Sequence, residues 1–274
     1  VKRVLADADT FISGRGIAVS DEMNAMLTGS IITSDGEAHT AIRVREAEPL
    51  TPRALEPLRR QVREEAAALI DRLAARREFD ALQDLACHLP VTIVADLVGL
   101  PERGRENMLE WSASIFQLVG PLNELSRGAL ARCGEMFEFA DAIRPQDVRP
   151  GSWAARIFAL HAAGAIDRTE VSRMLIDLIG PALDSTIFGI GNMILLLGNH
   201  PEQWALLRRS PDLVPNAVNE ALRLESPIRA FTRYSTRAAE FDGVEVPAGA
   251  RLLVLYASAN RDERQWGADA EQLR

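Results

Sequence analysis

The chain has 274 residues, a net charge of −8 at neutral pH and 26% charged side chains, which is enough for one large globular domain or two small ones. The negative charge argues against nucleic-acid binding, because proteins that neutralise phosphates are basic. The two cysteines, Cys87 and Cys133, fit no disulfide framework and no metal-ligand spacing, so we expect no protein-ligated metal site and a reducing, cytoplasmic setting.

The N-terminal region opens with a helical pattern over 1–8 and shows no signal peptide. Downstream, His39 and Arg43 are spaced i,i+4 and therefore share one face of a predicted helix. Two interpretations stay open for this pair. It is either a solvated basic patch or a site for carboxylates, which the planar guanidinium of arginine binds in bidentate fashion.

The middle of the chain is predicted to be almost entirely helical. Thr51 is an N-cap with Pro52 at the first helical position, and the apolar period then predicts a helix to Arg77. Prolines mark most breaks between the subsequent elements. The predicted helices are 81–99, 103–118, 122–143, 151–164, 168–199, 201–209 and 213–224.

An apolar run from Met174 to Leu197 is long enough to span a bilayer. However, Asp177 and Asp184 interrupt it, and carboxylates are costly at the centre of a membrane. We therefore expect a buried central helix of a soluble protein and no membrane span.

Pro181 lies inside this central helix, where it cannot donate a backbone hydrogen bond and pushes against the preceding turn. The pattern therefore predicts a kink. Asp184, Ser185 and Thr186 come next, and the two hydroxyls can bond the carbonyls that the kink frees. Either this is only a packed kink, or the adjacent acid and alcohol at the kink have a function.

Near the C-terminus, Glu220 and Arg223 have i,i+3 spacing, which alone indicates no more than a surface ion pair, since Glu56 and Arg59 share it. The next residues carry a more specific pattern. Ser226-Pro227 ends the helix, Arg233 stands alone after it, and the apolar period changes to two. Short strands are predicted over 233–236, 239–241, 244–246 and 252–254.

This order of motifs, with the kink and the H-x-x-x-R pair upstream, resembles the cytochrome P-450 family. The resemblance spans essentially residues 1–274 and implies a single domain, mainly α with a small β appendage, around a long kinked central helix. Because the chain starts at Val1 and no cysteine follows Cys133, we expect a fragment that lacks the family's N-terminal sheet region and C-terminal cysteine loop, and that is inactive alone.

The resemblance also implies roles. The family's haem b would have its axial cysteine outside this chain, with His39, Arg43 and Arg233 at its propionates and Ala182 against it. Asp184 takes the acid role, Ser185 the alcohol role that threonine usually fills, and Thr186 follows them in the catalytic set. Glu220 and Arg223 are structural and brace the segment around 260–262.

Substrate-pocket positions carry over more loosely, with plain core packing as the alternative at each. They are Phe116, Val119, Ile179, Gly180, Ile228 and Phe231. Residues 104–109 and 120–124 resemble a bacterial subgroup that acts on small aromatic acids. At its carboxylate-anchoring places this chain has Met26, Gly29, Asp177 and Gly180, so we expect no cation there and a small, largely apolar substrate, aromatic or not.

The resemblance as a whole implies a haem-dependent monooxygenase that hydroxylates or O-demethylates its substrate. It would use O2 and electrons from NAD(P)H, delivered by a ferredoxin-type partner and its reductase. Two alternatives remain: a haem-free descendant that serves as a binding or scaffold module, and an unrelated α-helical small-molecule binding protein. The sequence beyond Arg274 would distinguish them.

Overall fold

The computed structural model describes residues 1–274, apart from the side chain of Glu48. The helices are α1 (Lys2–Ala6), α2 (Asp21–Leu27), α3 (Gly36–Ala47), α4 (Pro52–Arg76), α5 (His88–Val98), α6 (Met108–Val119), α7 (Glu124–Ala142), α8 (Trp153–Ala162), α9 (Arg168–Ile179), α10 (Asp184–Asn199), α11 (Pro201–Arg209), α12 (Val214–Leu224), α13 (Tyr256–Ala259) and α14 (Glu263–Trp266). The strands are β1 (Phe11–Ile12), β2 (Ala230–Ser235), β3 (Ala239–Phe241), β4 (Val244–Val246) and β5 (Arg251–Leu255).

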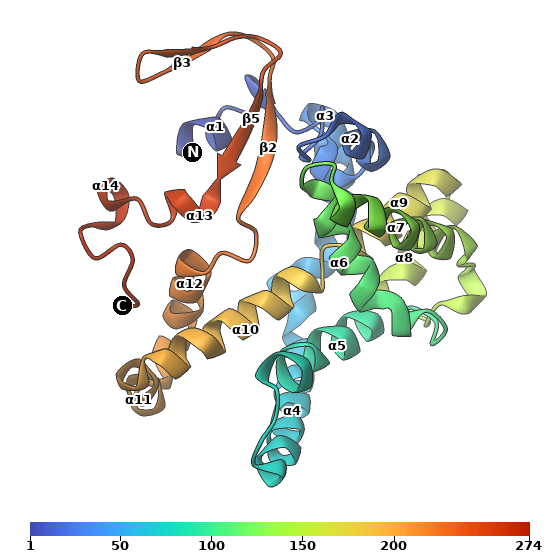
Figure 1. Ribbon diagram of the computed structural model, residues 1–274. Coiled ribbons are helices and arrows are strands. Elements are labelled where there is room, and N and C mark those ends of the chain that lie inside the picture. The colour runs from blue at the N-terminus through green and yellow to red at the C-terminus, as the bar shows by residue number, and fades with distance from the viewer.

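The helices are arranged in two parts that α9 and α10 connect (Figure 1). One part holds α2 to α9, and its core is a continuous apolar cluster to which Met108, Met136 and Leu175 contribute with no exposed surface. The other part holds α10 to α14, α1 and the strands, and both chain ends lie on this side. The cavities of the candidate site lie where the two parts meet.

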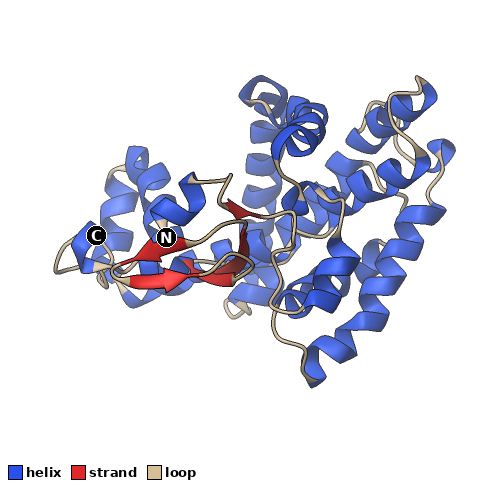
Figure 2. Cartoon of the chain, turned by 90° about the horizontal axis from the view of Figure 1, so that it is seen from above, coloured by secondary structure: helices blue, strands red, loops and turns tan.

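The strands form one three-stranded sheet in the order β1-β2-β5 and one separate hairpin of β3 and β4, all antiparallel. Seen from above, they lie beside the helices of the C-terminal part (Figure 2). The predicted hairpin strands 239–241 and 244–246 are confirmed, whereas β1 was not predicted. It pairs Phe11 with Ser235, so the start of the chain is fixed to a strand from its far end.

The central helix is interrupted rather than merely kinked. Instead of one helix over 168–199, α9 ends at Ile179 and α10 begins at Asp184. Pro181 has no N–H to donate to the carbonyl of Asp177, one turn back. On the other side of the break, Ser185 Oγ donates to the Pro181 carbonyl and Thr186 Oγ1 to that of Ala182, both at 3.0 Å. These side-chain bonds stabilise the start of α10.

The predicted helix 81–99 is also divided. A π-helical turn over Ala81–Ala86 precedes α5, because the Cys87 N–H donates to the Leu82 carbonyl at 2.9 Å and widens the turn. Ala81–Val98 and Arg168–Asn199 are long and apolar enough to cross a membrane by length and composition alone. The second of these stretches contains the break, with an acidic residue on each side of it.

Candidate functional site

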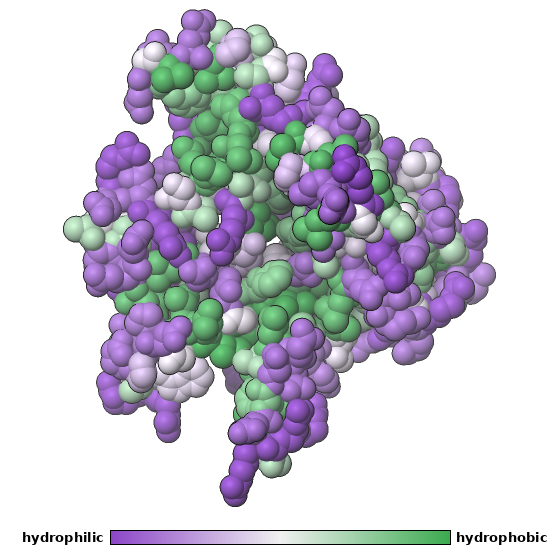
Figure 3. Space-filling model, in the orientation of Figure 1, coloured by the Kyte–Doolittle hydropathy of each residue, from purple (hydrophilic) through white to green (hydrophobic). Residues whose placement is uncertain are grey.

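Two cavities adjoin where the parts of the molecule meet. The first, which we call the α2–α9 cavity, has a volume of about 800 Å³ between α2, α3, α6 and α9. The second, the α10–α12 cleft, has a volume of about 770 Å³ and is lined by α10, α12 and β2. Ile32 and Phe231 border both. Figure 3 shows a hollow in the middle of this face with apolar side chains around it.

The α10–α12 cleft is apolar along most of its length. Ile190 and Met193 of α10 face it, with Leu222 of α12 opposite, and Ile228 and Phe231 line it near β2. At its polar positions are the hydroxyl-bearing Ser185 and Thr186 and the guanidinium of Arg233. The cleft thus offers a long apolar surface with alcohols at one place and a cation at another.

Asp184 lies at the start of α10 and is half-buried. Its backbone N–H donates to Ser112 Oγ at 3.2 Å, and the same hydroxyl donates to the Gly180 carbonyl at 2.8 Å. Burial raises the pKa of the Asp184 carboxyl, and hydrogen bonding by Ser112 opposes that rise. The carboxyl therefore holds its proton to higher pH than an exposed aspartate does. Ser112, which no sequence signal marked, organises the break.

The three predicted carboxylate-binding cations do not all lie in one cavity. His39 and Arg43 line the α2–α9 cavity, whereas Arg233 lines the α10–α12 cleft. Arg233 donates to the neighbouring Thr232 carbonyl at 2.8 Å and makes no ion pair within the part of the chain that the structure describes. Its charge is therefore available to a ligand.

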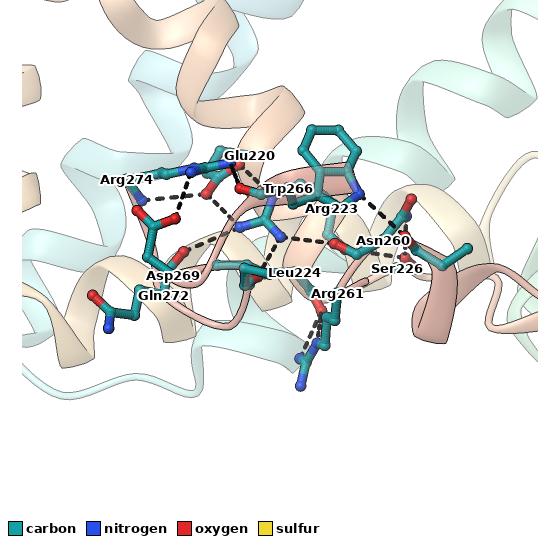
Figure 4. A network of polar contacts seen from close by, with 12 residues as sticks. Glu220, Arg223, Leu224, Ser226, Asn260, Arg261, Trp266, Asp269, Gln272 and Arg274 are labelled. Carbon is teal, nitrogen blue, oxygen red and sulfur yellow. Dashed lines mark hydrogen bonds and ion pairs between the residues drawn. The ribbon is translucent and has the colours of Figure 1, made fainter. Parts of the chain in front are cut away.

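The Glu220–Arg223 pair is the centre of a dense polar network (Figure 4). The Arg223 side chain is 5% exposed and donates hydrogen bonds to both Glu220 carboxylate oxygens, each at 2.7 Å. Its N–H groups also donate to the carbonyls of Asn260, Ala270 and Gln272. The pair thus holds the last turns of the chain against α12.

Four of the predicted pocket residues line the cavities. Phe116 and Val119 line the α2–α9 cavity, Ile228 lines the α10–α12 cleft, and Phe231 borders both. Ile179 lines neither cavity. It has no exposed surface and packs in the helical core, which is the alternative that the sequence left open.

Gly180 is buried in the break, where an added Cβ would lie 2.4 Å from Ile115 Cδ1. It lines neither cavity, and neither do Ala182 and Asp184.

The expectation that no cation faces the carboxylate-anchoring places is wrong, because Arg173 lines the α2–α9 cavity beside Asp177. Sequence reasoning marked Met26 and Gly29 in this region, but it missed the other residues between Met26 and Ile32 that form one wall of this cavity. That segment is short and has no apolar period, so it carried no signal.

The two cysteines lie away from both cavities. Cys133 is 1% exposed, and burial raises the pKa of its thiol to about 11. Burial likewise raises the pKa of the half-buried Cys87 thiol, with Asp184 contributing. Both residues are therefore protonated thiols near neutral pH and pack with the helical core.

Comparison with known proteins identifies the class. The Cytochrome P450 family model matches residues 160–273. "Cytochrome p450 CYP199A2" of Rhodopseudomonas palustris is 35% identical over 97% of this chain and 66% of its own length. "Cytochrome P450 130" of Mycobacterium tuberculosis is 30% identical over 97% of this chain and 68% of its own length.

A solved structure of a P450 EryK mutant in complex with erythromycin B aligns over 100% of this chain and 70% of its own, with a TM-score of 0.84 and 28% identity. The chain belongs to the cytochrome P450 family. It spans about two thirds of the length of the curated relatives it matches, 66% of one and 68% of another.

The family implies a haem-iron cofactor, and the residues of the α10–α12 cleft fit one. Haem is a flat apolar macrocycle with carboxylates at one edge. The cleft offers apolar walls from α10 and α12, small residues where α10 begins, and Arg233 without an acidic partner among the described residues. The lining of the cleft therefore fits both the apolar macrocycle and the carboxylates of a haem.

Proposed function

We propose that the complete protein is a cytoplasmic, haem-dependent monooxygenase that hydroxylates or O-demethylates a small, largely apolar molecule. The observation that carries this proposal is the junction of the break before α10 with the apolar cleft. There, the hydroxyls of Ser185 and Thr186 line a surface suited to the cofactor, and Asp184 directly precedes them in the chain. The α2–α9 cavity adjoins this cleft. The family relationship supports the reaction class.

When bound, the haem would supply oxygen activation, with electrons from NAD(P)H through a ferredoxin-type partner and its reductase. The protein would supply binding and proton control. Arg233 would pair with a propionate, and His39 and Arg43, which line the adjoining cavity, are the further candidates for this role. The apolar walls of the cleft would exclude water.

Proton control is assigned to Asp184 and Ser185. Burial raises the pKa of the Asp184 carboxyl, so this group can hold and release a proton closer to neutral pH than an exposed aspartate. The Ser185 hydroxyl, 3.0 Å from the Pro181 carbonyl, can turn between that acceptor and the cleft. Phe116, Val119 and Phe231 would orient the substrate by apolar contact.

The test uses Asp184→Asn, Ser185→Ala and Ser185→Thr in the complete, haem-loaded protein. We expect Asp184→Asn to bind substrate normally but to turn over roughly 10²–10⁴-fold more slowly, the usual contribution of a positioned acid. Ser185→Ala should release more hydrogen peroxide per NAD(P)H, whereas Ser185→Thr should keep product formation coupled.

Thr92→Val is the matched control, because its hydroxyl also bonds the carbonyl one turn back, at 3.0 Å from His88 O, on a different helix. Product and peroxide are measured per NAD(P)H consumed. Unchanged rate and coupling in both Asp184→Asn and Ser185→Ala would reduce the site to a packed break. A complete protein that takes up no haem would favour the scaffold alternative instead.

A further inference from the structure

The wall of the α2–α9 cavity that faces α9 is a single stretch of chain. Met26, Leu27, Thr28 and Ile31 all line the cavity. The stretch closes on itself, because Thr33 Oγ1 donates to the Leu27 carbonyl at 2.6 Å and Ser34 Oγ to that of Ile31 at 2.8 Å. It is therefore a turn that its own hydrogen bonds hold together.

This turn touches α9 at two places. The backbone N–H of Ile31 donates to Asp177 Oδ2 at 3.0 Å. Gly29, with a φ of +90°, lies under the Arg173 guanidinium, so close that an added Cβ would be 2.8 Å from Cζ. Arg173 and Asp177 are spaced i,i+4 and share one face of α9. The two side chains thus hold the turn from the same helix face.

Of these two contacts, only the one between Ile31 and Asp177 is a hydrogen bond. Its acceptor is a carboxylate, and such a bond is stronger than a hydrogen bond between neutral groups. Asp177 is also short of other partners. Within the described part of the chain, its carboxylate accepts a hydrogen bond only from the Ile31 N–H, and Arg173 forms no ion pair with it at 4.0 Å or less. This hydrogen bond therefore satisfies the Asp177 carboxylate and also fixes the turn to α9.

We propose that Asp177 is a positioning residue that fastens the Met26–Ile31 wall to α9 and keeps the α2–α9 cavity closed on that side. This inference rests on the proposed function only in calling the cavity a substrate site. It concerns the wall itself, so it is testable without haem, substrate or turnover.

The experiment compares the wild-type chain with Asp177→Ala and Asp177→Asn. Alanine removes the acceptor, whereas the asparagine carbonyl can still accept from Ile31 N–H. In Asp177→Ala we expect the Ile31 amide to exchange its hydrogen roughly 10- to 100-fold faster, the usual effect of losing a hydrogen bond to a charged group. Asp177→Asn should restore most of the protection.

A methyl NMR spectrum provides a second readout with internal controls. In Asp177→Ala, the methyl signal of Met26 should sharpen and move toward its disordered position. The signals of Met108 and Met136, which have no exposed surface, should not change. Asp96→Ala is the control variant, since it removes a 2.8 Å ion pair with Arg105 away from the cavity and should leave Met26 and Ile31 as in the wild type.

Three results would overturn the proposal. The first is wild-type exchange at Ile31 in Asp177→Ala. The second is an Asp177→Asn chain that behaves like Asp177→Ala. The third is a shift of the Met108 and Met136 signals together with Met26, which would mean general loosening of the fold. Failure of the haem-dependent activity would leave all three measurements interpretable.

Discussion

At the scale of single residues, the chain holds two glutamate–arginine pairs of identical spacing and very different surroundings. Glu220 and Arg223 have side chains 13% and 5% exposed, whereas Glu56 and Arg59 are 70% and 77% exposed. An exposed pair is screened by water, and a buried one leaves an uncompensated charge when broken. The same four-residue pattern therefore has different energetic consequences.

We expect Glu220→Ala to lower the free energy of unfolding by roughly 3–5 kcal/mol, because Arg223 would stay buried without its carboxylate. Glu56→Ala should change it by less than about 0.5 kcal/mol. Urea unfolding of the two variants measures both. Equal, small effects would mean that the Glu220–Arg223 network contributes little to stability.

Spacing alone could not separate these two pairs. The carbonyls that bury Arg223 belong to Asn260, Ala270 and Gln272, far along the chain, and no local pattern indicates them. The resemblance to the family supplied the buried interpretation. The resemblance likewise led to the prediction that Ser185 and Thr186 are catalytic, whereas the separation of His39 and Arg43 from Arg233 depends on tertiary packing.

At the scale of elements, the interruption between α9 and α10 depends on a third helix. Pro181 predicted a disturbance, yet the helix ends because Ser112 of α6 satisfies groups on both sides of the break. Its side chain has no exposed surface. A single sequence cannot show which serine will reach a distant carbonyl. A kink was therefore predicted, but neither the full break nor the role of Ser112 was.

Ser112→Ala should destabilise the chain by about 1–3 kcal/mol, because the Gly180 carbonyl loses its buried donor and the Asp184 N–H its acceptor. Ser114→Ala is the matched control on the same helix. Its hydroxyl only bonds the Glu110 carbonyl one turn back, at 2.7 Å, so we expect a much smaller loss. Thermal unfolding of both variants checks the difference, and a Ser112→Ala chain as stable as Ser114→Ala would contradict the bracing role of Ser112.

At the scale of the whole molecule, stability is coupled to pH through Glu46, a buried acid of α3. Glu46 is 9% exposed, and its Oε1 has no hydrogen-bond partner among the residues that the structure describes. Burial, with a further contribution from repulsion by Asp177, raises the pKa of Glu46 to about 7, and Arg43 opposes the rise. The folded chain therefore binds a proton here at pH values where the unfolded chain does not.

Linkage fixes the sign of the pH dependence. Between the ordinary pKa of 4.5 and the folded value of about 7, the native state binds more protons than the unfolded state, so stability falls as pH rises through this window. At about 1.4 kcal/mol per unit of pKa displacement, the full loss is on the order of 3–4 kcal/mol. Above pH 7 the full penalty of a buried carboxylate remains.

Glu46→Gln should remove most of this dependence, because the amide keeps the shape of the side chain but cannot ionise. We expect the variant to match the wild type near pH 5 and to be more stable at pH 8, as measured by urea unfolding at both values. Glu102→Gln, at a side chain 93% exposed, should follow the wild-type curve. If Glu46→Gln shows the same fall in stability between pH 5 and pH 8 as the wild type, the proton is held elsewhere, and Asp177, whose pKa burial raises to about 6, becomes the group to test.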